Sequence, residues 1–182
     1  GYRLVAGGNN VTLIDSNPEA AETLATELRG VSKQGAVVKT GTLENVELGD
    51  VVVLAVYYGA NLDVVKQLGN RLAGKTVVDI ANPLNGTYDG LATAPDSSSA
   101  EDLAKVVPAS AKVVKAFNTT FAGTLVDGQV GGQKLDVFIA GDDEAAKQVV
   151  SRLVTDGGLV AVDAGPLLRS RQLEGLGLLG IT

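Results

Sequence analysis

The stretch DVVVLAVYYG, residues 50–59, decides the fold class of this chain of 182 residues. An almost continuous apolar run leads here into two tyrosines and a glycine. Continuous apolar runs, as opposed to alternating ones, are typical of parallel strands that helices cover on both faces. Runs of the same kind, each ending in polar or turn-forming residues, occur at residues 11–15, 77–83 and 113–119. Because open α/β sheets bind ligands beyond the carboxyl ends of their strands, we expect the residues after these runs to line one crevice.

The runs alternate with amphipathic segments in β-α-β order throughout, which predicts a Rossmann-like, doubly wound α/β domain with a mostly parallel sheet. The length and a hydrophobic content of 45% suit one dinucleotide-binding domain over residues 1–182. Such a domain opens with a strand, a glycine-rich turn and a helix, whereas residues 1–8 have the pattern of a helix tail. We therefore expect the first strand to lie outside the sequence, with Gly1 as the last glycine of a G-x-G-x-x-G turn. The expected elements are strands over residues 11–15, 36–39, 50–56, 76–80, 112–117, 136–140 and 159–162, and helices over residues 19–29, 61–72, 100–107, 144–155 and 167–179.

The composition argues against several classes of function. A formal net charge of −6 disfavours nucleic acid and anionic membrane surfaces as partners. No apolar run of about 18 residues is present, so no membrane span is expected, and a cytoplasmic protein is the default. The absence of cysteine and histidine excludes thiolate catalysis, zinc–thiolate sites and an imidazole acid or base, and no metal site is expected.

Asp15 is the candidate for a ribose contact. It ends the first predicted strand, where a carboxylate can accept hydrogen bonds from the adenosine ribose and repels a 2′-phosphate. NADP-binding domains usually place Arg or Lys just after this strand, but Ser16 and Asn17 follow it here, which locally favours NAD. An alternative stays open, because Asp-Ser-Asn-Pro is also a good sequence for capping a helix.

The residues after the central strand are candidates for the floor of a cofactor site. Ala55 and Val56 would form this floor, and Tyr57 or Tyr58 would pack on the cofactor. In the alternative interpretation, one tyrosine belongs to the core and the other to a loop. Neither begins a Tyr-x-x-x-Lys pair, so the acid pair of short-chain dehydrogenases is absent.

Two asparagines end the next two predicted strands. Asn82 with Pro83 follows one of them, and Ala116, Asn118 and Thr119 lie at the end of the other, so all five are candidates for cofactor contacts. An asparagine amide at these positions can hydrogen-bond a carboxamide or a ring carbonyl, so Asn82 and Asn118 are candidates for orienting a cofactor ring. Turn formation is the alternative, because Asn-Pro is itself a strong turn signal.

The segment VVKAFNT at residues 113–119, with DIANPL at residues 79–84 before it, resembles the coenzyme F420-dependent NADP oxidoreductase family. DVFIAGDD at residues 136–143 and DAGPL at residues 163–167 continue the resemblance, which ends in the helix around residues 171–174 and covers nearly the whole chain. It implies a Rossmann fold with a short C-terminal helical extension, often dimeric, that transfers hydride between NADP(H) and a deazaflavin. The cytosolic domain of the STEAP metalloreductases is similar, and there the acceptor is a flavin.

The chain departs from the family pattern at two positions. Family members that bind NADP typically carry Ser-Arg or a similar pair where this chain has Asp15-Ser16. Members that act on the deazaflavin can carry His where Asn118 stands. The first departure concerns the choice of dinucleotide and the second the identity of the electron acceptor.

These observations predict an oxidoreductase that transfers hydride between NAD(P)H and a flavin or a deazaflavin similar to coenzyme F420. Transfer between two rings needs no side-chain acid when the acceptor ring stabilises its own charge or takes a proton from water. Catalysis would then be mostly alignment of the rings in a dry cleft, with the loop at residues 85–99 covering the second ring. An NAD(P)-binding module that senses redox state or binds a partner without turnover is the alternative, and a homodimer is compatible with either.

Overall fold

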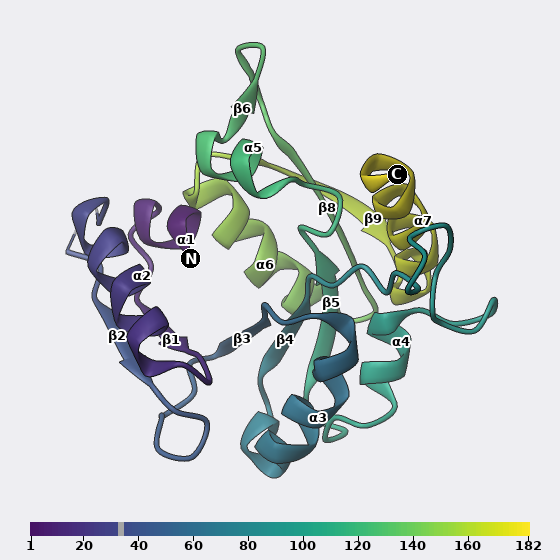
Figure 1. The fold of residues 1–182 in the computed structure, drawn as a ribbon, viewed down its shortest axis with the longest axis horizontal. Coiled ribbons are helices and arrows are strands. Elements are labelled where there is room, and N and C mark those ends of the chain that lie inside the picture. Colours follow the sequence, from purple (N-terminus) through teal and green to yellow (C-terminus); the bar gives the residue numbers. More distant parts are fainter. Residues whose placement is uncertain (33–34) are drawn as a thin grey trace.

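The apolar runs form the strands of two parallel or mostly parallel sheets in the computed structural model, which describes residues 1–32 and 35–182 (Figure 1). In the smaller sheet, β1 (Val11–Ile14) pairs in parallel with β2 (Val38–Gly41). The larger sheet contains, in spatial order, β3 (Val51–Leu54), β4 (Thr76–Asp79), β5 (Lys112–Ala116), β8 (Asp136–Gly141) and β9 (Val160–Gly165).

Helices cover both faces of the larger sheet, as the continuous apolar runs predicted. Val77 and Val113 point to the face covered by α3 and α4, whereas Val78 and Val114 point to the face covered by α6. The helices are α1 (Tyr2–Ala6), α2 (Pro18–Gly30), α3 (Tyr58–Leu68), α4 (Ser99–Ala104), α5 (Ala122–Asp127), α6 (Glu144–Asp156) and α7 (Ser170–Ile181), with the short 3₁₀ helices η1 (Gly69–Leu72) and η2 (Leu167–Arg169).

A separate small core joins the N-terminal elements. α1 and α2 pack with β1 and β2 around Val5, Leu28 and Val38. The order β2-β1 and the order β3-β4-β5 follow the doubly wound pattern, in which one further strand would pair with both β1 and β3. Within the described residues, β1 and β3 are not paired with each other. The Rossmann-like fold class and the C-terminal helix are as the sequence predicted.

Local capping signals explain where the helices begin. Asn17 accepts hydrogen bonds from the backbone N–H groups of Glu19 and Ala20 at the start of α2, and Pro18 occupies its first position. At the start of α4, the Ser98 hydroxyl caps the helix by accepting from the Glu101 N–H, and it also donates to the Glu101 carboxylate.

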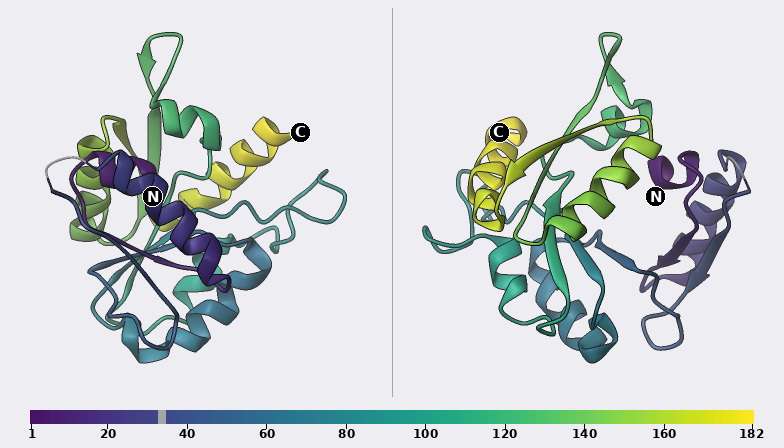
Figure 2. Two further views of the ribbon diagram at one scale, coloured as in Figure 1. Left: turned by 60° about the vertical axis from the view of Figure 1, so that its left-hand side comes forward. Right: turned by 180° about the vertical axis from the view of Figure 1, so that it is seen from behind.

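The expectation of β-α-β order throughout is wrong at one point. β8 pairs with β5 in antiparallel orientation. The connection contains only the six-residue α5 and the exposed hairpin of β6 (Gln129–Val130) and β7 (Gln133–Lys134), which projects from the body in Figures 1 and 2. Because no crossover helix carries the chain back to the other edge, β8 starts at the edge where β5 ends. The turns after β8 and β9 therefore lie at the opposite edge from Asn82 and Asn118.

Smaller differences concern the ends of two helices. The expected helix over residues 61–72 begins earlier, at Tyr58, and its last turn is the 3₁₀ helix η1, while α4 ends at Ala104, earlier than expected.

Among the described residues, no helix is both long enough and apolar enough to cross a bilayer.

Candidate functional site

The carboxyl ends of three parallel strands meet at one edge of the larger sheet. Leu54, Asp79 and Lys115 lie side by side, because β3, β4 and β5 pair in register. The residues that follow them in the chain reach this edge together. Ala55, Val56 and Tyr57 are exposed there, and Tyr57 is 94% exposed. Three of the four expected strand ends therefore meet at one edge, whereas β1, which Asp15 follows, belongs to the smaller sheet.

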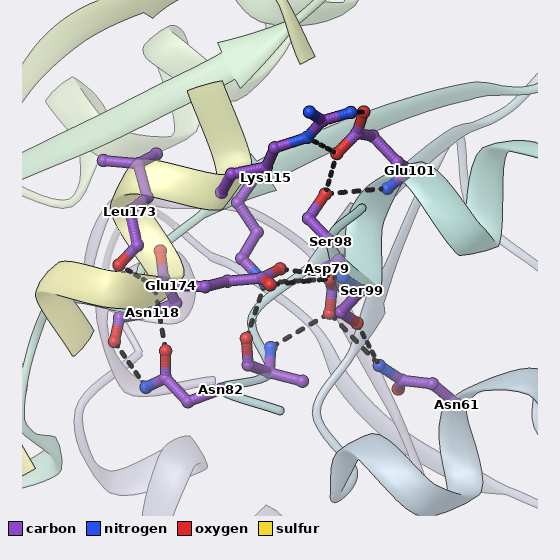
Figure 3. A network of polar contacts seen from close by, with 12 residues as sticks. Asn61, Asp79, Asn82, Ser98, Ser99, Glu101, Lys115, Asn118, Leu173 and Glu174 are labelled. Carbon is purple, nitrogen blue, oxygen red and sulfur yellow. Dashed lines mark hydrogen bonds and ion pairs between the residues drawn. The ribbon is translucent and has the colours of Figure 1, made fainter. Parts of the chain in front are cut away.

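Asn82 and Asn118 form a reciprocal pair at this edge (Figure 3). The Asn82 amide donates to the Asn118 carbonyl oxygen at 2.8 Å, and the Asn118 amide donates to Asn82 Oδ1 at 2.9 Å. The Asn118 amide also donates to the Leu173 carbonyl of α7 at 2.8 Å. Asn118 Oδ1 is buried and has no hydrogen-bond partner among the described residues. The pair is thus fastened to α7 on one side and retains one unused acceptor.

Gly177 of α7 makes the close contact with this pair possible. A Cβ atom at this position would lie 2.2 Å from Asn82 Oδ1 and 2.8 Å from its Cγ. Real Cβ atoms do not approach other heavy atoms so closely, so any side chain here would displace either the helix or Asn82. Position 177 therefore requires glycine because of the close contact with Asn82, and not because of its backbone conformation.

The backbone is strained at the end of β5. Phe117 has a φ of +64°, in the left-handed region that non-glycine residues rarely adopt. This conformation lies between Ala116, which is buried on the α6 face, and Asn118, which contacts α7. Strained residues persist where the surrounding structure fixes them, and they concentrate at functional sites.

A buried ionic cluster lies beneath this edge (Figure 3). The Lys115 ammonium donates to Asp79 Oδ2 at 2.9 Å, to Glu174 Oε1 at 2.8 Å and to the Ala81 carbonyl at 2.5 Å. All three charged side chains are 0% exposed. The Glu174 carboxylate also accepts from the Ser99 N–H at the start of α4.

The cluster contains one more carboxylate than ammonium groups. Burial raises the pKa of Glu174 above its usual value, although Lys115 and the Ser99 N–H lower it in part. The Asp79 carboxylate is compensated further by hydrogen bonds from the Ala81 N–H at 3.0 Å and the Asn61 amide at 3.2 Å. Because these groups are buried, they support the edge and do not line it.

The other predicted site residues occupy different surroundings. Asp15 and Ser16 are exposed after β1, and Asp15 Oδ1 accepts from the Asn17 N–H at 2.8 Å. Gly1 precedes α1 and packs near Leu28 of α2. Pro83 and Ala116 are buried and Thr119 is half-buried. Pro83 and Ala116 therefore support the edge from beneath, whereas Asp15 and Ser16 face solvent.

The two tyrosines after β3 differ in their surroundings. Tyr57 is exposed at the start of α3, while Tyr58 is partly buried. Burial, together with the negative charges of Asp102, Glu174 and Asp79, raises the pKa of Tyr58. Tyr58 therefore belongs to the supporting side of the edge, and Tyr57 is the tyrosine that is available to a ligand.

The loop between Pro83 and Ser98 is ordered by its own contacts. Leu84 and Leu91 form an isolated antiparallel bridge, and Asn85 donates to Asp89 at 2.8 Å. The loop projects from the body beside α4 in Figure 1. Its expected role as a cover for a second ring stays a prediction. Among the residues that the structure describes, no group of three or more possible ligands could hold a metal ion.

The supporting residues Lys115, Glu174 and Gly177 were not singled out from the sequence. A lysine within an otherwise apolar strand was a signal that it needs a buried partner. Its partner Glu174 is 59 positions away, on a helix that the sequence pattern assigned without placing it against β5. Only the fold brings these two residues together.

Three comparisons with known proteins all find F420-dependent NADP reductases or related reductases. The model of the family described as "NADP oxidoreductase coenzyme F420-dependent" matches residues 2–83. The chain is 36% identical to the F420-dependent NADP reductase of Methanocaldococcus jannaschii, over 97% of this chain and 82% of that protein. It is 32% identical to the metalloreductase STEAP3 of Rattus norvegicus, over 97% of this chain but only 33% of that protein. The crystal structure of a candidate F420-dependent NADP reductase from Arthrobacter matches 96% of this chain and 84% of that one at 30% identity, with a TM-score of 0.76.

Proposed function

Because this chain belongs to the family of coenzyme F420-dependent NADP oxidoreductases, we propose that it transfers hydride between NAD(P)H and a flavin or deazaflavin at the edge formed by the ends of β3, β4 and β5. The family membership confirms the resemblance inferred from the motifs and the interpretation of an oxidoreductase. The identity of the acceptor and the roles of individual residues are parts of the proposal.

The observation that carries the proposal is the chemical character of this edge. It presents apolar and aromatic groups, at Ala55, Val56 and Tyr57, next to an amide pair and above buried charges. Such an edge offers apolar surface against which two rings can be aligned. Hydride transfer to a ring that takes its proton from water needs only this alignment.

The residues present fit a nicotinamide ring. The carboxamide of the ring has both a donor and an acceptor, and Asn118 Oδ1 is an acceptor without a partner among the described residues. Asn82 and Asn118 would orient this group, and Ala55 and Val56 would form the floor beneath the ring. The dinucleotide supplies the hydride when it is bound, and the chain supplies orientation and an apolar surface.

The experiment that tests this function is steady-state oxidation of NADPH and of NADH, with FMN or coenzyme F420 as added acceptor. Asn118→Ala should lower kcat by about tenfold to a hundredfold, because misplacement of a reacting ring by about 1 Å is enough to have such an effect. Asn10→Ala is the matched control, since Asn10 directly precedes β1, at the other end of this strand from Asp15, and accepts from the Val37 N–H. Turnover that is unchanged in Asn118→Ala would refute the role of Asn118.

The choice of dinucleotide is a finer part of the proposal. The family name points to NADP, but the turn after β1 presents the exposed carboxylate of Asp15 followed by Ser16. We propose that Asp15 disfavours the 2′-phosphate by charge repulsion while accepting bonds from a free ribose. Asp15→Ala should then raise the ratio of NADPH to NADH affinity about tenfold in a fluorescence titration, which corresponds to about 1.4 kcal/mol. An unchanged ratio would assign Asp15 to the turn alone, where it already accepts from the Asn17 N–H.

The alternative function is a redox-sensing or interaction module that binds NAD(P)H without turnover. It is supported by the 94% exposure of Tyr57, because an edge open to solvent suits binding better than hydride transfer, which needs water to be excluded. Tight binding of NADPH together with no oxidation by any flavin or deazaflavin would favour this alternative.

A homodimer is also part of the proposal. Leu176 and Leu179 lie on one side of α7 and are 45% and 74% exposed, Ile181 at its end is 43% exposed, and Phe121 is exposed nearby. Burial of such side chains in a second copy would be favourable. Sedimentation equilibrium of the wild type and of Leu179→Lys tests this, since the substitution should shift the equilibrium towards the monomer.

A further inference from the structure

Lys115 has every proton of its ammonium group bound inside the protein. Its three acceptors are Asp79, Glu174 and the Ala81 carbonyl, at 2.9, 2.8 and 2.5 Å. Lysine is almost never fully buried unless it is paired. Buried ion pairs are often no more stabilising than apolar residues of similar size, so stability alone is a weak reason for this arrangement.

The three acceptors belong to segments that define the candidate ring site. The Ala81 carbonyl directly precedes Asn82, and the Ala81 N–H is held by Asp79 at 3.0 Å. Glu174 lies on α7, next to Leu173, whose carbonyl accepts from Asn118. Lys115 therefore joins the turn after β4 to the helix that fastens the Asn82–Asn118 pair (Figure 3).

We propose that Lys115 is a positioning residue for the hydride transfer proposed above, and that it acts by locking the turn at residues 81–83 and α7 in one relative position. This inference rests on the proposed function. Lys115 is fully buried and does not reach the ring site itself. Its contribution is therefore the orientation of Asn82 and, through α7, of Asn118.

The variant that tests this proposal is the double substitution Lys115→Met and Glu174→Gln. It removes one positive and one negative charge together, so the cluster keeps its excess of one carboxylate, and Asp79 retains its bonds from Asn61 and the Ala81 N–H. The matched control is Lys147→Met with Glu144→Gln. The Lys147 ammonium also pairs with two carboxylates, those of Glu144 and Asp163, both at 2.8 Å, but it lies at α6 and β9, away from the edge.

The first measurement combines affinity, turnover and stereochemistry, using NADPH deuterated at the 4R or the 4S position of the nicotinamide. In the double variant we expect an NADPH Kd within about threefold of wild type, because the other parts of the dinucleotide bind elsewhere, but a kcat lowered about tenfold to a hundredfold. Transfer should also lose its strict preference for one face of the ring. The control pair should change neither kcat nor stereospecificity.

The second measurement, hydrogen exchange without cofactor, does not depend on activity. The amides of residues 79–84 and of α7 should exchange about tenfold faster in the double variant and at the wild-type rate in the control. Absence of turnover in the wild type would refute the proposed function, and faster exchange in the double variant would then still show that Lys115 locks the turn to α7.

Two results would overturn the positioning role itself. One is wild-type exchange and stereospecificity in the double variant. The other is a weaker affinity for NADPH, a lower kcat and a lower thermal stability together, with stereospecificity retained, since a purely structural residue would have this effect. If the double variant does not fold, Glu174→Gln alone is used, and it must lower kcat at least threefold at unchanged Kd.

Discussion

The contact between Gly177 and Asn82 leads to a prediction in which helix propensity and packing have opposite signs. Gly177→Ala places a methyl group in the interior of α7, where replacing glycine normally stabilises a helix by about 1 kcal/mol. Here the new Cβ would lie 2.2 Å from Asn82 Oδ1. Overpacking of this kind costs about 1–3 kcal/mol, and displacing a buried amide from its hydrogen bonds costs about 1–3 kcal/mol more.

The net expectation is a loss of about 1–5 kcal/mol in the free energy of unfolding, with a central value of about 3 kcal/mol. For a chain of this size, 1 kcal/mol corresponds to about 2–4 °C in Tm, so the central value for Gly177→Ala is a Tm lowered by about 6–12 °C. Gly175→Ala is the control in the same helix, because a Cβ there would meet nothing within 4 Å. It should raise Tm by about 2–4 °C.

Thermal unfolding followed by circular dichroism measures both variants at equal concentration. A Tm that rises in Gly177→Ala by as much as in Gly175→Ala would show that α7 and Asn82 are not in close contact. The attachment of the Asn82–Asn118 pair to α7 would then have to be abandoned.

Two further predictions concern the charged groups near α4 and α7. Burial raises the pKa of Glu174 above its ordinary value of 4.5. The contribution of Glu174 to the free energy of unfolding is therefore complete below pH 4.5 and is lost as the pH rises through the pKa of the folded state. Denaturant titrations should show the unfolding free energy of the wild type falling relative to Glu174→Gln from about pH 4.5 upward, and the same pH dependence in both proteins would refute this. Arg171 forms two hydrogen bonds with Glu101, at 2.8 and 2.7 Å, and lowers the pKa of that carboxyl group. Arg171→Met should lower the free energy of unfolding by about 1 kcal/mol at neutral pH, and this loss should shrink as acid protonates Glu101. Lys66→Met is the control: it removes an exposed ion pair and should lower the free energy of unfolding by less than about 0.5 kcal/mol at any pH.

The strands and helix starts could be predicted from the sequence because their causes are local. The run at residues 51–54 is apolar without interruption, and Ser98 and Asn17 are capping residues whose partners lie within three positions. Local signals of this kind depend on the backbone nearby and not on the rest of the fold.

The direction of β8 and the environment of the candidate site could not be predicted, because they depend on distant contacts. A connection of about the same length between β5 and β8 could have returned the chain to either edge of the sheet. Because this connection contains a short helix and a hairpin, it leaves β8 antiparallel to β5. The strand ends indicated that Asn82 and Asn118 would lie close together. They did not indicate that α7 would hold both residues, because Gly177 is 95 positions from Asn82.

The burial of Lys115 has a consequence for the chemical reactivity of the folded protein. Amine-reactive reagents need an accessible, unprotonated amine, and Lys115 is 0% exposed with three bound acceptors. Exposed lysines such as Lys66 should therefore be acylated at once, whereas Lys115 should be acylated only while α7 is detached from the sheet. The rate at which mass spectrometry detects this one acylated lysine would then report how often α7 opens, without any ligand or turnover.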